Sequence, residues 1–216
     1  MTNESLSRIE AAASRGDYTS MARLARALYQ DGLDPGEVLR RCYGVAFPAE
    51  FFVIAEARPL SLDLPVDFTN QPWQLAIPLA QGGPGAMPDS MEETEQQIFA
   101  IDPDLLPLAL FLDPDVQHGD LVICYRITEL GLGRTTVFGV EEDPGVEDEA
   151  VPCGASLLTV LHEYHADLHC MLERHHGLPS NRGFGSIDAE QVAEARSRVE
   201  RIEELRHRLA ERTRGG

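Results

Sequence analysis

Eleven of the fourteen prolines lie between Pro59 and Pro152, and this clustering constrains the fold more than any other feature of the sequence. Proline disrupts helices beyond their first turn, so the middle of the chain is a poor source of long helices. Its apolar runs are short and rich in β-forming residues, which is typical of a sheet with irregular connections. We therefore expect strands at 73–79, 96–101, 120–127 and 135–140.

The connections within this expected sheet are of two kinds. The runs 120–127 and 135–140 predict a β-hairpin whose turn lies in TELGLGR, where two glycines relieve strain at positive φ. The stretch QGGPGAMPDSMEETE, residues 81–95, is rich in small, turn-prone and acidic residues between two expected strands. We expect it to be a mobile loop.

Both ends of the chain show the apolar periodicity of helices. The first 32 residues predict a helical hairpin, and Asp34 and Pro35 begin a third short helix that runs to about Tyr43. Residues 154–176 predict an amphipathic helix. The segment 186–213 predicts a long helix that must dock on a partner surface, either the 155–176 helix or a second copy of itself. Its narrow apolar seam consists of Val192, Ala195, Val199, Ile202, Leu205 and Leu209.

Together these patterns predict an α+β fold with a central, mostly antiparallel sheet, flanking helices, an N-terminal helical hairpin and a long C-terminal helix. We expect three parts: an N-terminal helical extension at 1–37, an α+β domain at 38–176, and a linker with an amphipathic helix at 177–216. No apolar run approaches the roughly 20 residues of a membrane span, and the N-terminus has no signal peptide. The widely spaced cysteines indicate reduced, mostly buried thiols and a cytoplasmic location.

The net charge of −18 comes from the central part of the chain. Residues 61–170 contain twenty acidic residues and two arginines, whereas acids and arginines nearly balance in the two flanking parts, and the chain has no lysine. Nucleic acid is a poor partner for such a surface, because phosphate binding needs a basic face. A basic protein is a better partner, although an acidic balance can also serve solubility alone.

The stretch HEYHADLHCMLERHH, residues 162–176, raises the question of a metal site, because it holds five of the seven histidines. His162, His165, His169 and His176 fall on one side of the expected helix. His165 and His169 could chelate one ion, but HEYH is one residue short of the zincin motif H-E-x-x-H, and the chain has no second ligand pair. We expect a half-buried helix edge whose imidazoles meet the sheet rim or the C-terminal helix, with no metal and no cofactor.

Motifs of catalysis are also missing from the sequence. A P-loop needs lysine, and GFGS at 183–186 lacks the spacing of a serine hydrolase elbow. Trp73, the only tryptophan, is expected in the core. A carboxylate pair for glycoside cleavage stays open, because spacing in sequence does not give distance in space. We therefore predict a protein that is not an enzyme, with a hydrolase as a distant alternative.

Four segments occur in an order that matches a known family. YGVAFPAEFFVIAE places small residues and a proline before an acidic, aromatic helix, and LLPLALFLDPDVQHGDLVICYRI contains a Leu-Pro strand, a Gly-Asp turn and a second strand. RTTVFGVEED is a strand that runs into acids, and GASLLTVLHEYHADL is a closing helix. Over about residues 38–172 the chain thus resembles the SUKH superfamily. It departs from the usual pattern at EARPLSLDLP, where members have Asn-Gly, and at His118, where they have glycine.

The resemblance implies binding without catalysis, since many SUKH proteins are bacterial immunity proteins that neutralise toxins, often nucleases, and others are regulatory modules. A basic nuclease would associate quickly with an inhibitor that offers carboxylates. The densest acidic stretches, 113–120 and 141–149, would form one patch if they lie at the same end of the sheet, while the simpler interpretation is two solvated loops. The predicted partner-binding residues are Asp113, Asp115, Asp120, Glu141, Glu142, Asp143, Glu147, Asp148 and Glu149. The alternative function is a regulatory or scaffold protein that assembles through its terminal helices, including a homodimer through the 187–213 helix.

Overall fold

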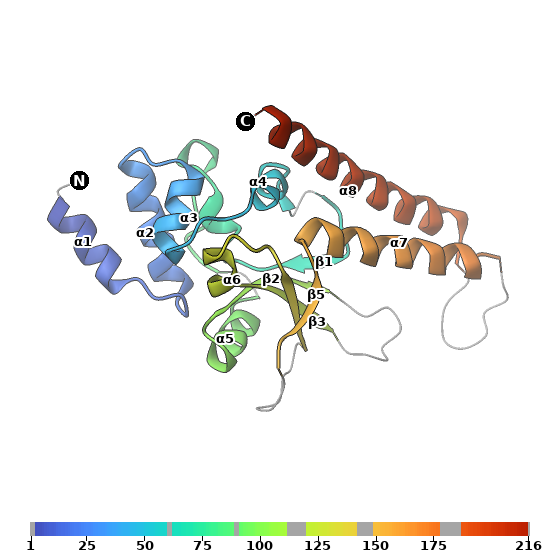
Figure 1. Ribbon diagram of the computed structural model, residues 1–216, viewed down its shortest axis with the longest axis horizontal. Helices are drawn as coiled ribbons and strands as arrows, with labels where there is room; N and C mark the ends of the chain where they lie inside the picture. The colour runs from blue at the N-terminus through green and yellow to red at the C-terminus, as the bar shows by residue number, and fades with distance from the viewer. Residues whose placement is uncertain are drawn as a thin grey trace.

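The computed structural model describes residues 3–59, 62–88, 91–111, 120–141, 149–177 and 187–215. It confirms the predicted α+β fold, with a helical N-terminal region, a central antiparallel sheet and a long C-terminal helix (Figure 1). Within the described residues the sheet has the order β1-β2-β3-β4-β5, and each strand is antiparallel to its neighbours. Its strands are β1 (Val66–Phe68), β2 (Leu105–Phe111), β3 (Leu121–Arg126), β4 (Val137–Glu141) and β5 (Val151–Gly154).

Helices cover both faces of this sheet, as the alternation of side chains along β3 shows. Ile123 and Tyr125 belong to the main core, which they share with residues of α4 (Ala49–Glu56) and α7 (Leu157–His175). Val122 and Cys124 point to the opposite face and belong to a smaller core with Ile98. Ile98 lies on α5 (Glu92–Ile101), so the strands are buried on both sides.

The three helices expected at the N-terminus are present as α1 (Asn3–Ala12), α2 (Tyr18–Gln30) and α3 (Pro35–Tyr43). The side chain of Asp34 accepts a hydrogen bond from the backbone N–H of Glu37, as its N-cap position predicts. Gly44 ends α3 in the left-handed conformation at φ 78°. The N-terminal helices contribute to the same continuous core as the sheet and the C-terminal helix.

Two of the expected strands are wrong. The run 96–101 belongs to α5, because three glutamates in the first turn favour a helix N-terminus and Ile98 is buried one turn after Glu95. The run 73–79 contains the short 3-10 helices η2 (Gln74–Ala76) and η3 (Leu79–Gln81). In this segment the indole N–H of Trp73 donates a hydrogen bond to the backbone carbonyl of Leu108 on β2 at 2.7 Å.

The expected mobile loop at 81–95 also differs from the structure. Its last residues begin α5 instead of connecting two strands. Its first part is held by α2, since the hydroxyl of Tyr18 donates to the carbonyl of Gly85 at 3.1 Å and Arg26 donates to the carbonyl of Pro84. Long polar side chains from a distant helix therefore fix a segment that has no apolar anchor of its own.

The predicted hairpin of β3 and β4 is confirmed, with one addition to its turn. The connection contains the short helix α6 (Ile127–Gly131). Gly133 has a positive φ of 74°, as expected, whereas Gly131 is helical and relieves no strain. One of the two glycines therefore has the role that the sequence suggested.

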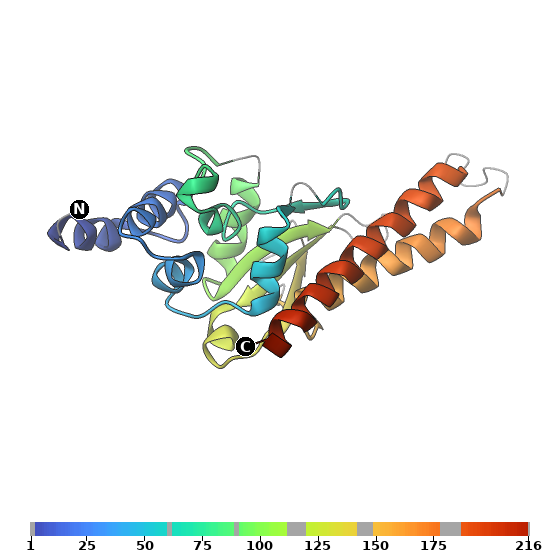
Figure 2. The same cartoon turned by 90° about the horizontal axis from the view of Figure 1, so that it is seen from above.

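The C-terminal helix α8 (Ala189–Gly215) runs antiparallel to α7 and continues onto α4 (Figures 1 and 2). Ala195, Ile202 and Leu205 from its apolar seam are buried in these contacts. The sequence left two docking surfaces open for this helix, the 155–176 helix and a second copy of itself. The structure shows α8 docked on the first of these, which is α7. No described helix combines the length and the apolar character that a membrane span requires.

The cysteine prediction is correct for pairing and partly wrong for burial. Each of the four cysteines is free. Cys124 is buried and Cys42 is half-buried, but Cys153 on the edge strand β5 and Cys170 on α7 are exposed. The short edge strand leaves one side of Cys153 uncovered, and Cys170 lies on the side of α7 that faces away from the core.

Candidate functional site

The two acidic stretches predicted to bind a partner are attached to the same end of the sheet. Phe111, the last residue of β2, pairs with Leu121, the first residue of β3. Leu121 also pairs with Glu141, the last residue of β4. Neighbouring strands lie about 4.8 Å apart, so the strand ends next to which the stretches 113–120 and 141–149 lie in the sequence are side by side. We call this the acidic sheet end, defined by Asp120, Glu141 and Glu149 among the described residues.

The structure describes these three of the nine predicted partner-binding residues. Glu141 and Glu149 are exposed and Asp120, which directly precedes β3, is half-buried. The other six lie outside the described residues: Asp113, Asp115, Glu142, Asp143, Glu147 and Asp148. Asp120 therefore lies immediately before β3, next to the strand β4 that Glu141 ends, and Glu149 lies shortly before β5.

The two arginines of the central part lie away from the acidic sheet end. Arg126 is the last residue of β3, at the opposite end from Leu121, and its guanidinium lies 2.8 Å from an oxygen of Asp102. Arg134 lies in the connection that follows β3, and its guanidinium is 3.0 Å from an oxygen of Glu129. Both cations are thus matched by carboxylates at the other end of the sheet. Neither of them offsets the acids around Leu121.

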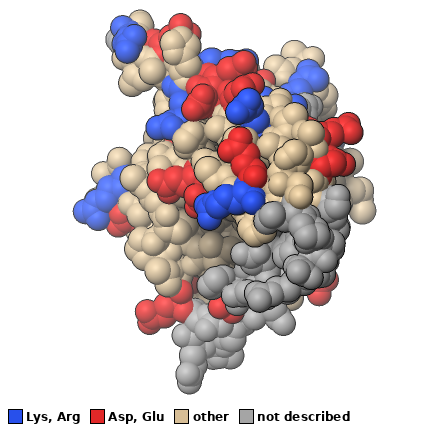
Figure 3. All heavy atoms as spheres, turned by 90° about the vertical axis from the view of Figure 1, so that its right-hand side faces the viewer, with Lys and Arg blue, Asp and Glu red and all other residues tan. Residues whose placement is uncertain are grey.

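The arginines of the terminal helices are distributed differently. Figure 3, which views the molecule from the right-hand side of Figure 1, shows Arg side chains interspersed with Asp and Glu over the upper part of that face. On α8, Arg198 lies 2.6 Å from Glu194, one turn earlier on the same helix, and Arg196 lies 3.7 Å from Glu173 on α7. Positive and negative side chains therefore lie close together on α7 and α8, unlike those in the central part of the chain.

A buried carboxylate that the sequence did not reveal lies at the start of α7. Glu50 on α4 is 3% exposed and accepts hydrogen bonds from the hydroxyl of Tyr125 at 2.8 Å and from the backbone N–H groups of Leu157 and Leu158. These two N–H groups belong to the first turn of a helix and have no partner within it. Glu50 and the N-cap side chain of Ser156 together satisfy that first turn, so Glu50 has a structural role.

A second buried carboxylate, Glu95, lies on α5 and is 1% exposed. It accepts hydrogen bonds from the backbone N–H groups of Asn70 and Gln71, which places α5 against the segment before Trp73. The neighbouring phenol of Tyr43 donates to the side chain of Gln71 at 3.1 Å. Burial raises the pKa of Tyr43 well above its ordinary value, so this phenol stays protonated. This cluster positions the irregular segment 69–73.

The histidines of α7 mainly make contacts within α7 and with α8. His165 is 1% exposed, and its Nδ1–H donates to the carbonyl of Leu161 at 2.7 Å. His162 lies 3.5 Å from Glu203 on α8, and His169 lies 3.4 Å from Glu173. Burial is the main cause that lowers the pKa of His165 to about 4, with smaller contributions from Arg198 and His162. The chelating pair proposed from sequence is thus split between a buried ring and a ring that faces a glutamate.

Metal-ligating side chains do not converge in the part of the chain that the structure describes. There, no group of three or more His, Cys, Asp or Glu side chains has the arrangement of a metal site. Burial also raises the pKa of the half-buried Cys42 thiol to about 12. A thiol with a raised pKa is a weak nucleophile near neutral pH.

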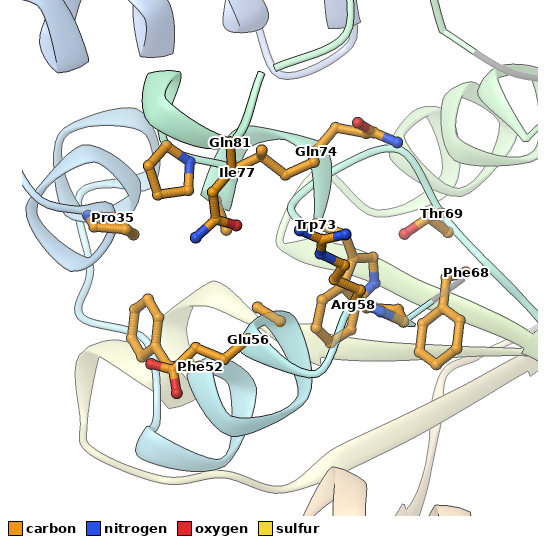
Figure 4. Close-up of a pocket in the computed structure, with 14 residues that line it drawn as sticks. Pro35, Phe52, Glu56, Arg58, Phe68, Thr69, Trp73, Gln74, Ile77 and Gln81 are labelled. Atoms are coloured by element: carbon orange, nitrogen blue, oxygen red, sulfur yellow. The ribbon is translucent and has the colours of Figure 1, made fainter. Parts of the chain in front are cut away.

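A pocket of about 330 Å³ lies between α4, the start of α3 and the segment after β1 (Figure 4). Its walls are mostly aromatic and aliphatic, and Phe52 and Pro35 face Trp73 across it. Trp73 is 5% exposed and stacks on Phe51 with ring centroids 4.4 Å apart. The sequence correctly placed Trp73 in the core but did not reveal that one side of its ring lines a pocket.

Comparison with protein-family models, curated proteins and solved structures finds no match for this chain. The segments that resemble the SUKH superfamily do occur as α4, β2, β3, β4 and α7, in that order along the chain. The family assignment rests on this resemblance.

Proposed function

We propose that this protein is a non-enzymatic binding module that neutralises a basic, nuclease-type toxin through the acidic sheet end. The observation that supports the proposal best is the β2–β3–β4 register, which joins both acidic stretches to one end of the sheet. The resemblance to SUKH immunity proteins suggests the class of partner. A bacterial source and a cytoplasmic location are parts of the same proposal.

The charge distribution gives a physical reason for this choice of surface. Twenty acids and two arginines occur at 61–170, and both arginines are paired at the opposite end of the sheet. Like charges held together raise the energy of the folded state, and a basic partner would relieve that repulsion. Complementary charge also accelerates association, because it steers the two proteins into contact before they touch.

The alternative function, a scaffold that assembles through its terminal helices, receives less support from the packing. Ala195, Ile202 and Leu205 form the centre of the α8 seam and are already buried against the same chain. A homodimer through the 187–213 helix would need a different face of α8 or release of the helix. We keep the binding module as the proposal for this reason.

The test is the kinetics of binding to a candidate toxin, chosen from the products of genes that flank the one encoding this chain. Reversal of Asp113, Asp115 and Asp120, or of Glu141, Glu142 and Asp143, should lower the association rate at least tenfold at low salt, as expected for electrostatic steering. The effect should shrink at high salt, because ions screen charges beyond about 10 Å at 0.1 M.

The matched control is reversal of three acids on α8: Glu194, Glu200 and Glu204. All three are exposed, so this control set changes the net charge by the same amount as either central set. Equal slowing by the central and C-terminal sets would refute binding through the acidic sheet end. A candidate toxin that binds but keeps its nuclease activity would refute neutralisation while leaving the binding surface intact.

A further inference from the structure

We propose that the pocket beside Trp73 binds a small organic monocarboxylate with a flat, aromatic body. Its volume of about 330 Å³ lies within the range of small-molecule sites, which is about 300–1,000 Å³. Such sites combine apolar walls with a few polar groups that orient the ligand. The pocket has both components, and it is separate from the acidic sheet end.

The apolar part of the ligand follows from the side chains around the cavity. Phe52 on α4, Phe68 on β1 and Trp73 contribute aromatic rings, and Pro35 and Pro78 contribute rigid aliphatic ones. Phe68 and Trp73 meet edge to face with centroids 5.3 Å apart, so neither ring can turn freely to fill the cavity. Rigid aromatic walls favour a flat ligand that stacks against them.

The anionic part follows from the single cation among the lining residues, Arg58. Arg58 is exposed, lies beside Trp73 in Figure 4, and has no ion-pair partner among the described side chains. The one acid in the lining, Glu56, is instead bound by Arg212 of α8 at 2.9 Å. The Glu56 charge is therefore offset, and the guanidinium of Arg58 is left to receive a ligand.

A monocarboxylate fits this arrangement better than a phosphate. The fork of an arginine guanidinium matches either group with two parallel hydrogen bonds. A phosphate would bring up to two negative charges to a pocket with one unpaired cation, in a chain whose net charge is −18. One negative charge is what the lining residues can balance.

The backbone of Arg58 is strained. Its φ is 57°, in the left-handed region that few residues other than glycine, asparagine and aspartate adopt. Arg58 directly follows Ala57, the C-cap of α4, at a position where helices commonly end in this conformation. A glycine at this position would adopt the same conformation without strain, but it would lose the guanidinium.

Trp73 makes the proposal directly testable, because it is the only tryptophan of the chain and lines the pocket. The probe is 3-phenylpropionate, titrated into the full chain while tryptophan emission is followed with excitation at 295 nm. We expect a saturable change in emission. The neutral analogue 3-phenylpropanamide should bind at least tenfold more weakly, since it cannot form the charge-assisted pair.

Two substitutions of Arg58 separate binding from folding. Arg58→Asn keeps a residue that tolerates the left-handed conformation and should weaken binding of 3-phenylpropionate at least tenfold. Arg58→Gly should weaken it equally while raising the midpoint of urea unfolding, since it removes the strain. Arg134→Asn, which alters an exposed arginine elsewhere, should leave the affinity unchanged.

Three results would overturn the proposal. The first is the absence of any saturable emission change up to 10 mM 3-phenylpropionate, a concentration about ten times a dissociation constant of about 1 mM. The second is equal affinity for acid and amide. The third is unchanged affinity in Arg58→Asn, which would leave an apolar cavity without selection for an anion. None of these results bears on the acidic sheet end.

Discussion

His165 should make the folded state less stable as the pH falls below about 6.5, and a single substitution isolates its contribution. The ring is 1% exposed, its Nδ1–H donates to Leu161, and its Nε2 has no hydrogen-bond partner among the described atoms. Protonation would place a charge on this buried ring, near Arg198 of α8 and His162 of α7. The perturbation is His165→Leu, which keeps an apolar side chain at the site and removes the titrating group.

The magnitude follows from linkage between protonation and folding. The pKa of His165 falls from about 6.5 in the unfolded chain to about 4 in the folded protein. Between these values the unfolded state binds more protons, so the stabilisation is complete above pH 6.5 and is lost as the pH falls toward 4. The loss is about 1 kcal/mol at pH 5.5 and about 2 kcal/mol at pH 5.

The assay is urea unfolding followed by circular dichroism at pH 7.5, 6.5, 6.0 and 5.5, which stays above the isoelectric point of about 4.6. The wild-type chain should lose about 1 kcal/mol relative to His165→Leu between pH 7.5 and 5.5. The control is His207→Leu, which replaces a histidine whose side chain is 73% exposed instead of buried. A constant difference between wild type and His165→Leu would refute a neutral, buried His165.

Two further predictions concern the contacts that hold α7 in place. Glu50→Gln should lower the free energy of unfolding by about 2–4 kcal/mol in urea denaturation, because a charged acceptor of three hydrogen bonds is lost. The control Glu200→Gln, at an exposed position of α8, should change the free energy of unfolding by less than about 0.5 kcal/mol. Equal effects of the two substitutions would contradict the capping role of Glu50. Gly154→Ala should cost about 1–3 kcal/mol, since the new Cβ would lie 2.3 Å from Cγ2 of Val160. Adding Val160→Ala should recover part of that loss, and strict additivity in the double-mutant cycle would show that the two side chains do not clash.

The parts of the fold that could be predicted from sequence are those with strong local signals. Asp34 with Pro35 fixes the start of α3, and the run of buried residues in β3 follows from the apolar run in DLVICYRI. The run 96–101 could not be assigned from its own residues, because a six-residue run with four apolar positions fits either a strand or a helix. The glutamates that decide for a helix, at 92, 93 and 95, lie outside that run.

The candidate sites show a different limit. The acidic sheet end could be named from charge density, but its geometry depended on strand register, which pairs Phe111 with Leu121 across an intervening loop. The pocket could not be found at all, because Pro35, Phe52, Arg58 and Trp73 come from separate segments and none of them has a motif. The role of Glu50 could not be found either, since its partners Tyr125, Leu157 and Leu158 lie 75 to 108 residues away.

That separation determines when the protein can complete its fold during synthesis. Glu50 can form its hydrogen bond with Leu157 only after 107 further residues have been synthesised. Glu56 on the same helix can pair with Arg212 only after 156 further residues. Helix α4 therefore leaves the ribosome long before the segments that complete its surroundings. Contacts between such distant residues slow folding and leave apolar surface open to aggregation in the meantime. A nascent chain that stops before the 27-residue helix α8 would still display the surface of α4 that this helix covers.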